Sequence, residues 1–292
     1  MPTATDVDWL ELSARASFAS HRLVGWIYWD PRALAGYERL GLSGGGSYYL
    51  TSRGAPLAPA GHQAVAAAFY SIHPAFIEAC LTQAEQVTTY DAIMQVRDAA
   101  VVEGLCEYVP EICDRLAGLA PALWEAADAL PESGRVLFAA HRQRPRPDDA
   151  LLSGWLAVNC IREWRGDTHF ALLAAADLSG VQAGLLHNAL LRYPKEWIPR
   201  SRGADDAALT AAMADLERRG LATDGEVNAA GMALRNDIER RTDELSSRAW
   251  RHLGEAGTRE FLDLVEPVGD RLVARIDATA GPEWMPAARR QR

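Results

Sequence analysis

The chain has 292 residues, which is enough for two domains or one large helical unit with a substantial core. Its formal net charge of −9 argues against a broad nucleic-acid-binding surface unless basic residues are concentrated locally. No apolar run reaches about 18 residues, the length that a transmembrane helix needs. The acidic start lacks the basic-then-apolar order of a signal peptide, so we expect a cytoplasmic protein that does not contact a membrane.

Most of the chain is predicted to be helical, because alanine and leucine dominate and runs of β-branched residues are scarce. Residues 8–22 and 60–69 are predicted as helices, and residues 75–130 as several amphipathic helices. The glycine-rich stretch 41–59 is predicted as a loop. It lacks the Lys-Ser/Thr ending and the preceding strand of a phosphate-binding loop, so no nucleotide site is predicted there.

The stretch H-R-Q-R-P-R-P-D-D, residues 141–149, is charged, rich in proline and without helical periodicity. It is the best candidate for a domain boundary. We therefore predict a helical N-terminal domain over residues 1–145 and a second unit over residues 146–292, with a long central helix at 151–176. The cysteines show no C-x-x-C spacing and lie in apolar surroundings, so they are predicted to be reduced core thiols. These are Cys80, Cys106, Cys113 and Cys160.

Residues 204–234 contain a helix that ends in E-R-R-G-L, a short turn T-D-G-E, and a new helix that begins at N-A-A-G-M-A-L. This order resembles the winged-helix module of MarR-type proteins, in which L-x-x-R-G-L and L-T-x-x-G occupy the same places. The resemblance implies a mainly α fold, with a recognition helix at 205–219 and a wing at 223–226. The long last helix, 229–254, has the amphipathic pattern of a helix that packs against a partner or against the first domain. A winged helix followed by such a helix leads us to expect a homodimer.

DNA binding by this module is disfavoured by its charges. Asp205 and Asp206 open the helix that would enter the major groove, and the wing carries two acids and no base. Acids beside phosphates oppose the electrostatic attraction that supplies most non-specific affinity for DNA. Arg200 and Arg202, just upstream, are the candidate DNA-binding residues if this alternative holds.

The central helix carries an unusual group of charges in I-R-E-W-R-G-D-T-H-F, residues 161–170. At 3.6 residues per turn, Arg162, Arg165 and His169 share one stripe with Gly166, and Glu163 shares a second stripe with Asp167. Both stripes are apolar above and below the charges, which is not the pattern of a solvated face. Buried charges must be paired, so the structural alternative is a neutralised ion network between the two halves.

The functional interpretation makes this group the floor of a pocket. His169 would exchange a proton near neutral pH, with Glu163 or Asp167 orienting it or acting as the base. Arg162 or Arg165 would hold an oxyanion or carboxylate. A second candidate region is F-Y-S-I-H-P, where His73 follows Tyr70 at a helix break. His73, His169 and His187 have the residue type of metal ligands, but no metal-binding spacing connects them, so no metal and no cofactor are predicted.

The two motifs R-E-W-R-G-D-T-H and F-Y-S-I-H-P, followed by the winged-helix tail, resemble the actinobacterial "helix-turn-helix" family that includes SalK. The family's central motif reads R-E-H-R-G-D-G-H, so Trp164 and Thr168 depart from it. If the family's site uses the missing histidine, either the chemistry of this member has changed or the indole of Trp164 has reshaped its pocket. The family label implies transcriptional regulation.

From the residues, together with this resemblance, we predict a cofactor-independent acid–base enzyme of specialised metabolism. It would cyclise, isomerise or hydrolyse a small organic acid or polyketide-like intermediate, with a structural winged helix. The catalytic candidates are His169, Glu163 and Asp167, and the substrate-binding candidates are Arg162, Arg165, His73, Tyr70 and Trp164. The alternatives are a MarR-like regulator that senses a metabolite in the same pocket and binds DNA, and an interaction scaffold that has no pocket.

Overall fold

The computed structural model describes residues 7–289. This part of the chain is almost entirely helical, which confirms the predicted mainly α fold. Its only sheet is a hairpin of two antiparallel strands, β1 (Ala222–Thr223) and β2 (Glu226–Val227). The α-helices are α1 (Trp9–Gly25), α2 (Pro31–Arg39), α3 (Gly45–Gly54), α4 (His62–Phe69), α5 (Pro74–Val87), α6 (Tyr90–Tyr108), α7 (Cys113–Asp128), α8 (Val136–Arg142), α9 (Ala150–Ala175), α10 (Gly180–Leu191), α11 (Trp197–Ser201), α12 (Asp206–Arg218) and α13 (Ala229–Thr279).

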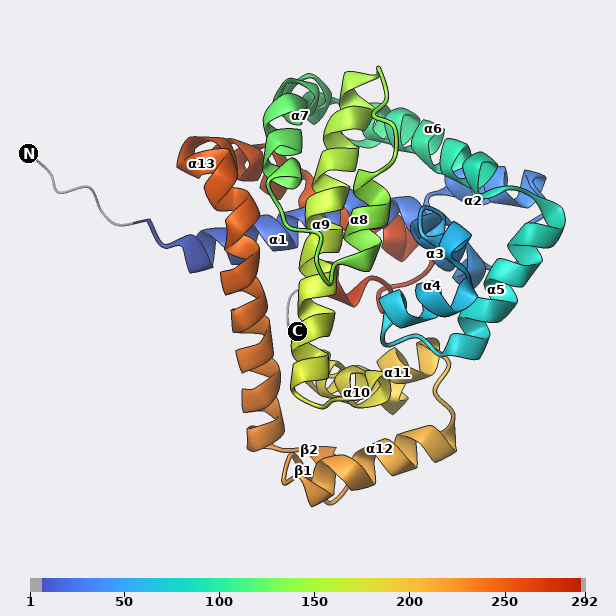
Figure 1. The fold of residues 1–292 in the computed structure, drawn as a ribbon, viewed down its shortest axis with the longest axis vertical. Helices are drawn as coiled ribbons and strands as arrows, with labels where there is room; N and C mark the ends of the chain where they lie inside the picture. Colours follow the sequence, from blue (N-terminus) through green and yellow to red (C-terminus); the bar gives the residue numbers. More distant parts are fainter. Residues whose placement is uncertain (1–6, 290–292) are drawn as a thin grey trace, which may run out of the picture.

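Helix α9 stands upright in the middle of the molecule (Figure 1). Its upper part lies among α1, α7 and α8, and its lower end leads into α10. Helices α10, α11 and α12 form the lower part of the molecule together with the hairpin, and α13 rises along one side from this lower part to the upper one. The central charged motif therefore lies where the two parts meet.

The main core contains residues from both sides of the domain boundary predicted near residue 145. It joins buried residues of α1, α6, α7, α9 and the far half of α13 into one cluster, with Trp26, Trp155 and Phe261 among its fully buried members. The reason is that α13 returns to pack along α1. A smaller second core lies between α10, α12 and the hairpin.

Short polar residues fix where several helices begin. Asp149 accepts a hydrogen bond from the backbone N–H of Leu152 at the start of α9, and Ser179 and Gln182 form a reciprocal capping box on α10. Asp205 accepts from the N–H of Ala208 and so begins α12. An acid at a helix N-terminus is also favoured by the helix dipole. Asp205 thus has a structural role in the fold.

Two predicted segments differ from the structure. The expected loop 41–59 contains α3, in which Tyr48, Leu50 and Thr51 are buried. Their burial against other helices overrides the low helix propensity of the glycines. The last helix does not end at Gly254, where the chain breaks its helical geometry at φ +81° and then continues as a second helical stretch to Thr279.

Helices α7 and α9 cross so closely that Gly154 has no room for a side chain. A Cβ at this position would lie 2.6 Å from the carbonyl oxygen of Leu116. We expect Gly154→Ala to lower the free energy of unfolding by about 1–3 kcal/mol, because backbone has to move. Gly118→Ala, on the exposed face of α7 with nothing within 4 Å, is the matched control and should stabilise by about 0.5–1 kcal/mol. Urea unfolding measures both, and equal effects would contradict this packing.

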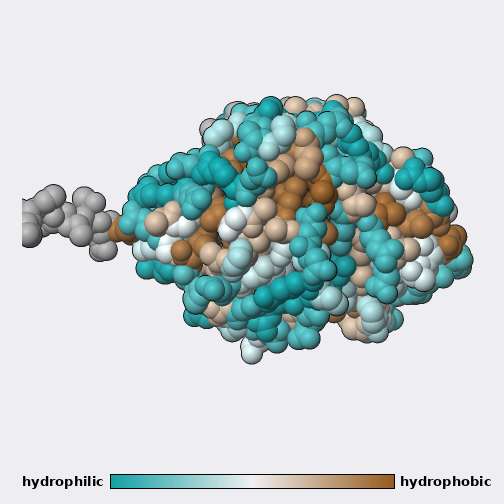
Figure 2. Space-filling view, turned by 90° about the horizontal axis from the view of Figure 1, so that it is seen from above, coloured by the Kyte–Doolittle hydropathy of each residue, from teal (hydrophilic) through white to brown (hydrophobic). Residues whose placement is uncertain are grey.

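No single helix in the described part is long and apolar enough to cross a membrane. Only α9 and α10 together meet the length and composition criteria, and they are bent by 108° relative to each other. Seen from above, the surface is mostly hydrophilic, with apolar patches between hydrophilic stretches (Figure 2).

Candidate functional site

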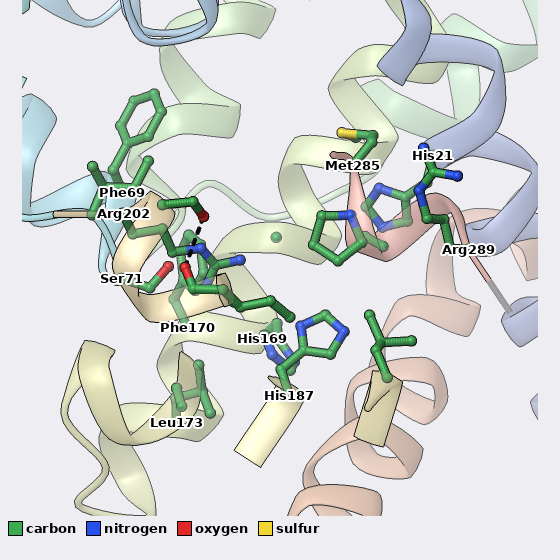
Figure 3. Close-up of a pocket in the computed structure, with 18 of the residues that line it drawn as sticks. His21, Phe69, Ser71, His169, Phe170, Leu173, His187, Arg202, Met285 and Arg289 are labelled. Carbon is green, nitrogen blue, oxygen red and sulfur yellow. Dashed lines mark hydrogen bonds between the residues drawn. The ribbon is translucent and has the colours of Figure 1, made fainter. Parts of the chain in front are cut away.

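A pocket of about 550 Å³ lies between the upper helices and the lower part of the molecule. Its walls come from α1, α3, α9, α10, α11 and α13, and from the segment after α13 (Figure 3). Most of the lining side chains are apolar, including Phe69, Phe170, Leu173, Leu186, Ile198 and Met285. The stripe predicted from helical spacing lies along this pocket, which is lined by Arg162, Arg165, Gly166 and His169.

The imidazole of His169 is held in one tautomer. Its Nδ1 lies 3.0 Å from the hydroxyl oxygen of Thr242, and that hydroxyl donates its only hydrogen to the carbonyl oxygen of Ile238 at 2.7 Å. Nδ1 must therefore carry the proton and donate it to Thr242. This leaves Nε2 of His169 as the unprotonated nitrogen, with its lone pair free to accept a proton.

Two more histidines line the pocket. His187 on α10 lies beside His169, and His21 on α1 lies on the opposite side (Figure 3). Burial lowers the pKa of His169 to about 4 and that of His187 to about 3, and it also lowers the pKa of His21 well below its usual value. Both ring nitrogens of His21 are buried without a hydrogen-bond partner in the described part of the protein. At neutral pH all three rings are therefore uncharged.

Glu163 is completely buried directly behind the pocket wall, between two arginines. Arg53 of α3 donates to it from Nε at 2.9 Å and from Nη2 at 2.6 Å, and Arg162 donates from Nη2. Burial opposes the charge on Glu163, but the two guanidinium groups outweigh it and hold the pKa of this carboxyl well below its usual range. Buried His141 donates to the backbone oxygen of Arg53 at 2.9 Å. Glu163 is therefore a permanent counterion, and the three side chains together carry one net positive charge.

Arg165 belongs to a separate, neutral network with α13. It pairs with Glu239 and with Asp243, the latter at 2.7 Å, and Arg235 pairs with Glu239 at 3.0 Å. Two cations thus face two anions. Burial raises the pKa of Asp243. Burial also opposes the charge on Glu239, but Arg165, His169 and Arg235 together outweigh it and lower the pKa of that carboxyl. Arg162 is thus paired with Glu163, and Arg165 with two acids of α13.

Five of the predicted catalytic and substrate-binding residues lie outside the pocket lining, and Glu163, just described, is one of them. Asp167 accepts a hydrogen bond from the N–H of Phe138 at 2.9 Å and so supports the start of α8, and burial raises its pKa to about 7. Trp164 donates from Nε1 to the carbonyl oxygen of Pro131 at 2.9 Å on the far side of α9. The helical spacing predicted that Asp167 and His169 lie on different stripes of α9. In the structure the stripe of Asp167 faces α8, and that of His169 faces the pocket.

The F-Y-S-I-H-P stretch reaches the pocket through Phe69, Ser71 and Ile72. His73 is exposed, and its Nδ1 accepts from the N–H of Ala75 to begin α5. Tyr70 stacks on Phe170 with ring centroids 5.4 Å apart, and its hydroxyl donates to the carbonyl oxygen of Leu178. The two residues predicted to bind substrate from this stretch therefore fix the corner between α4 and α5.

A "Helix-turn-helix family" profile matches the chain over residues 13–279. The chain belongs to this helix-turn-helix family. No curated protein and no solved structure matches it.

In this helix-turn-helix protein, the segment predicted as a winged-helix module, residues 204–234, forms α12, the short hairpin and the start of α13. Arg200, one of the two candidate DNA-binding residues, pairs with Asp206 at 2.7 Å and with Glu196 at 3.4 Å. Arg202, the other, lines the pocket instead of the outer face of α12. The exposed residues of α12 are Asp206, Ala207, Thr210, Ala211, Ala214, Glu217 and Arg218.

Metal chemistry finds no support in the arrangement of residues. Within residues 7–289, no three His, Cys, Asp or Glu side chains are placed so that they could hold a metal ion. Cys80 and Cys160 are buried, as expected of core thiols, but Cys106 is exposed. The prediction of a core thiol is therefore wrong for Cys106, whereas Cys113 is half-buried and packs against the main core.

Several pocket residues of the helix-turn-helix protein were not found from the sequence. His21 lies in an ordinary helical pattern, and Arg53 lies in a stretch that was predicted as a loop. Thr242 and Glu239 lie on the last helix, and no motif connects them with the central stretch. Arg202 was singled out, but for a DNA surface.

Proposed function

We propose that this protein is an acid–base enzyme that transfers a proton on a small, largely apolar organic molecule bound in the pocket. The observation that carries the proposal is the state of His169, whose Nδ1–H is fixed by Thr242 while Nε2 remains a free base in the pocket. A general base must be unprotonated and positioned before the substrate arrives. His169 meets both conditions at neutral pH.

In the proposed step, Nε2 of His169 takes a proton from a carbon or oxygen acid of the substrate, and the ring becomes an imidazolium. Glu239 raises the pKa of His169 against the stronger effect of burial, so it stabilises this charged state. The net positive charge of Arg53, Arg162 and Glu163 favours the negative charge that develops on the substrate oxygen. Return of the proton to a different atom completes an isomerisation or a cyclisation.

The proposal changes the roles predicted for two acids. Glu163 cannot act as the base, because its pKa is held low by Arg162 and Arg53. It positions these arginines. Asp167 does not line the pocket and has no role in the proposed step.

Deuterium uptake from D2O tests the proposed function without knowledge of the natural substrate. Aromatic and aliphatic 2-oxo and 3-oxo acids are incubated with the protein, and NMR follows the exchange of hydrogen on the carbon beside the carbonyl. We expect the wild-type protein to accelerate exchange for at least one compound, His169→Gln to abolish the acceleration, and His252→Ala, at an exposed position outside the pocket, to preserve it. No acceleration for any compound, or equal acceleration by His169→Gln, would contradict the proposal.

A transcriptional regulator is the second candidate, because the chain belongs to the helix-turn-helix family. The charges of α12 speak against it: Asp205 and Asp206 lie at its start, and Arg200 is already paired with Glu196 and Asp206. We expect no retardation of duplex DNA from the surrounding genome at about 50 mM salt, a condition that favours electrostatic binding to phosphates. Sequence-specific retardation that is lost in Arg200→Ala would establish the regulator instead.

A further inference from the structure

Arg202 is the one pocket arginine whose charge is not matched within the described part of the chain. It follows α11, at the turn before α12, and its guanidinium reaches toward the pocket (Figure 3). It makes no ion pair and no side-chain hydrogen bond with residues 7–289. Arg200 lies two positions earlier, within α11, and it faces outward and pairs with two acids. The contrast shows that the turn places one arginine in the pocket and one outside it.

The backbone of Arg202 is held in place although its side chain is free. The N–H of His73 donates to the carbonyl oxygen of Arg202 at 2.8 Å. Gly203 follows with φ +93°, a conformation that favours glycine, and its Cα approaches so closely that a Cβ would lie 2.9 Å from the Cβ of His73. The start of α5 therefore anchors the turn that presents the guanidinium.

Other positively charged side chains lie near Arg202. Burial lowers the pKa of Arg202, nearby Tyr49 raises it, and the positive charge of Arg53 lowers it further. Arg53 and Arg162 share the single carboxylate of Glu163. This end of the pocket therefore holds three guanidinium groups and one acid. An enclosed excess of positive charge is costly unless an anion compensates it.

The rest of the pocket is suited to an apolar body. Phe69, Phe170 and Leu173 line the wall near Arg202, and the histidines beyond them are uncharged at neutral pH. Small-molecule sites typically combine such apolar walls with a few polar groups that set the orientation. The planar guanidinium can bind a carboxylate through two parallel hydrogen bonds.

We infer that Arg202 binds the carboxylate of the pocket's ligand, and that this ligand is an organic acid with an apolar body. The inference rests on the proposed function for the assignment of the ligand as a substrate, but it can be tested separately. The inference gives the turn between α11 and α12 a function other than DNA binding, because this turn supplies the residue that selects the ligand by its charge.

The test compares two fluorescent probes with the same aromatic body, 8-anilino-1-naphthalenesulfonate and the uncharged N-phenyl-1-naphthylamine. A hydrogen-bonded charge in a pocket corresponds to a preference of about 10- to 100-fold, so we expect the wild-type protein to bind the anionic probe more tightly by this factor. Arg202→Gln should remove the preference with little effect on the neutral probe, and Arg202→Lys should keep part of it. Displacement of the anionic probe by 2-naphthoate, but not by 2-naphthamide, repeats the comparison for a carboxylate.

Two control variants make the result specific. Arg200→Gln removes an arginine of the same segment outside the pocket and should leave the preference unchanged. Leu190→Trp narrows the pocket and should weaken binding of both probes, which locates them there. Equal affinity of wild type for the two probes, a preference that survives in Arg202→Gln, or probe binding unaffected by Leu190→Trp would each overturn the inference. If the preference depends on Arg202 but no oxo acid exchanges deuterium, the inference stands and the proposed function fails.

Discussion

Replacing Glu163 by glutamine is expected to lower the free energy of unfolding by about 3–5 kcal/mol, the range found when one member of a buried ion pair is removed. The side chain is completely buried, and it is the shared acid of Arg53 and Arg162. Glutamine has nearly the same shape but no charge. It would leave two guanidinium groups facing each other in the interior, and their repulsion and lost solvation would both destabilise the fold.

Urea unfolding measures this effect, with Glu266→Gln as the matched control. Glu266 pairs with Arg15 on the surface, where both side chains are about two-fifths exposed. Exposed pairs contribute about 0.2–1 kcal/mol, so the control should change stability little. If Glu163→Gln were as mild as Glu266→Gln, the buried network would not be holding the pocket wall together.

His169→Gln is expected to lower the rate of proton transfer on any active substrate by about 10²- to 10⁴-fold, the usual contribution of a positioned general acid–base group. The amide of glutamine fills much of the same space and can still bond to Thr242, but it cannot accept a proton at neutral pH. Thr242→Val should give a smaller loss, because it removes the hydrogen-bond acceptor that selects the tautomer and leaves the base present. Steady-state kinetics with the substrate identified by deuterium exchange measures both.

The pH dependence of kcat/KM is a second test of the role of His169. Burial lowers the pKa of His169 to about 4, so the base form is present at neutral pH and is lost only as the pH falls through about 4. The value of kcat/KM should therefore rise with pH up to about 5 and then stay level on this limb. A limb centred near the ordinary histidine pKa of about 6.5 would show that His169 is not the buried group described here.

The sequence predicted the pocket's central wall because that wall is one helix. A charged motif within apolar surroundings, combined with a period of 3.6 residues, is enough to place Arg162 and His169 on one stripe and Glu163 and Asp167 on another. Periodicity says nothing about what lies across from each stripe. That is why the base was assigned partners within the motif, whereas the structure gives His169 its partner on α13 and Glu163 a partner on α3.

The residues that sequence reasoning misassigned depend on contacts between distant segments. Arg202 was associated with DNA because it precedes the helix expected to recognise bases. Only the fold shows that the turn before α12 faces inward, where the start of α5 holds it. His73 was selected as a histidine at a helix break. In the structure it begins α5, and its backbone N–H donates a hydrogen bond to the carbonyl oxygen of Arg202. A single sequence carries no signal for either arrangement.

The central claim is that His169 rests as a neutral imidazole with its free nitrogen, Nε2, available to a ligand in the pocket. Two-dimensional NMR of protein labelled with ¹⁵N-histidine measures the protonation of both ring nitrogens, and the spectrum of His169→Gln assigns the signals. At pH 7 we expect Nδ1 of His169 to be protonated and Nε2 to be unprotonated, with titration near pH 4. An Nε2–H tautomer, or a charged ring at pH 7, would contradict the account.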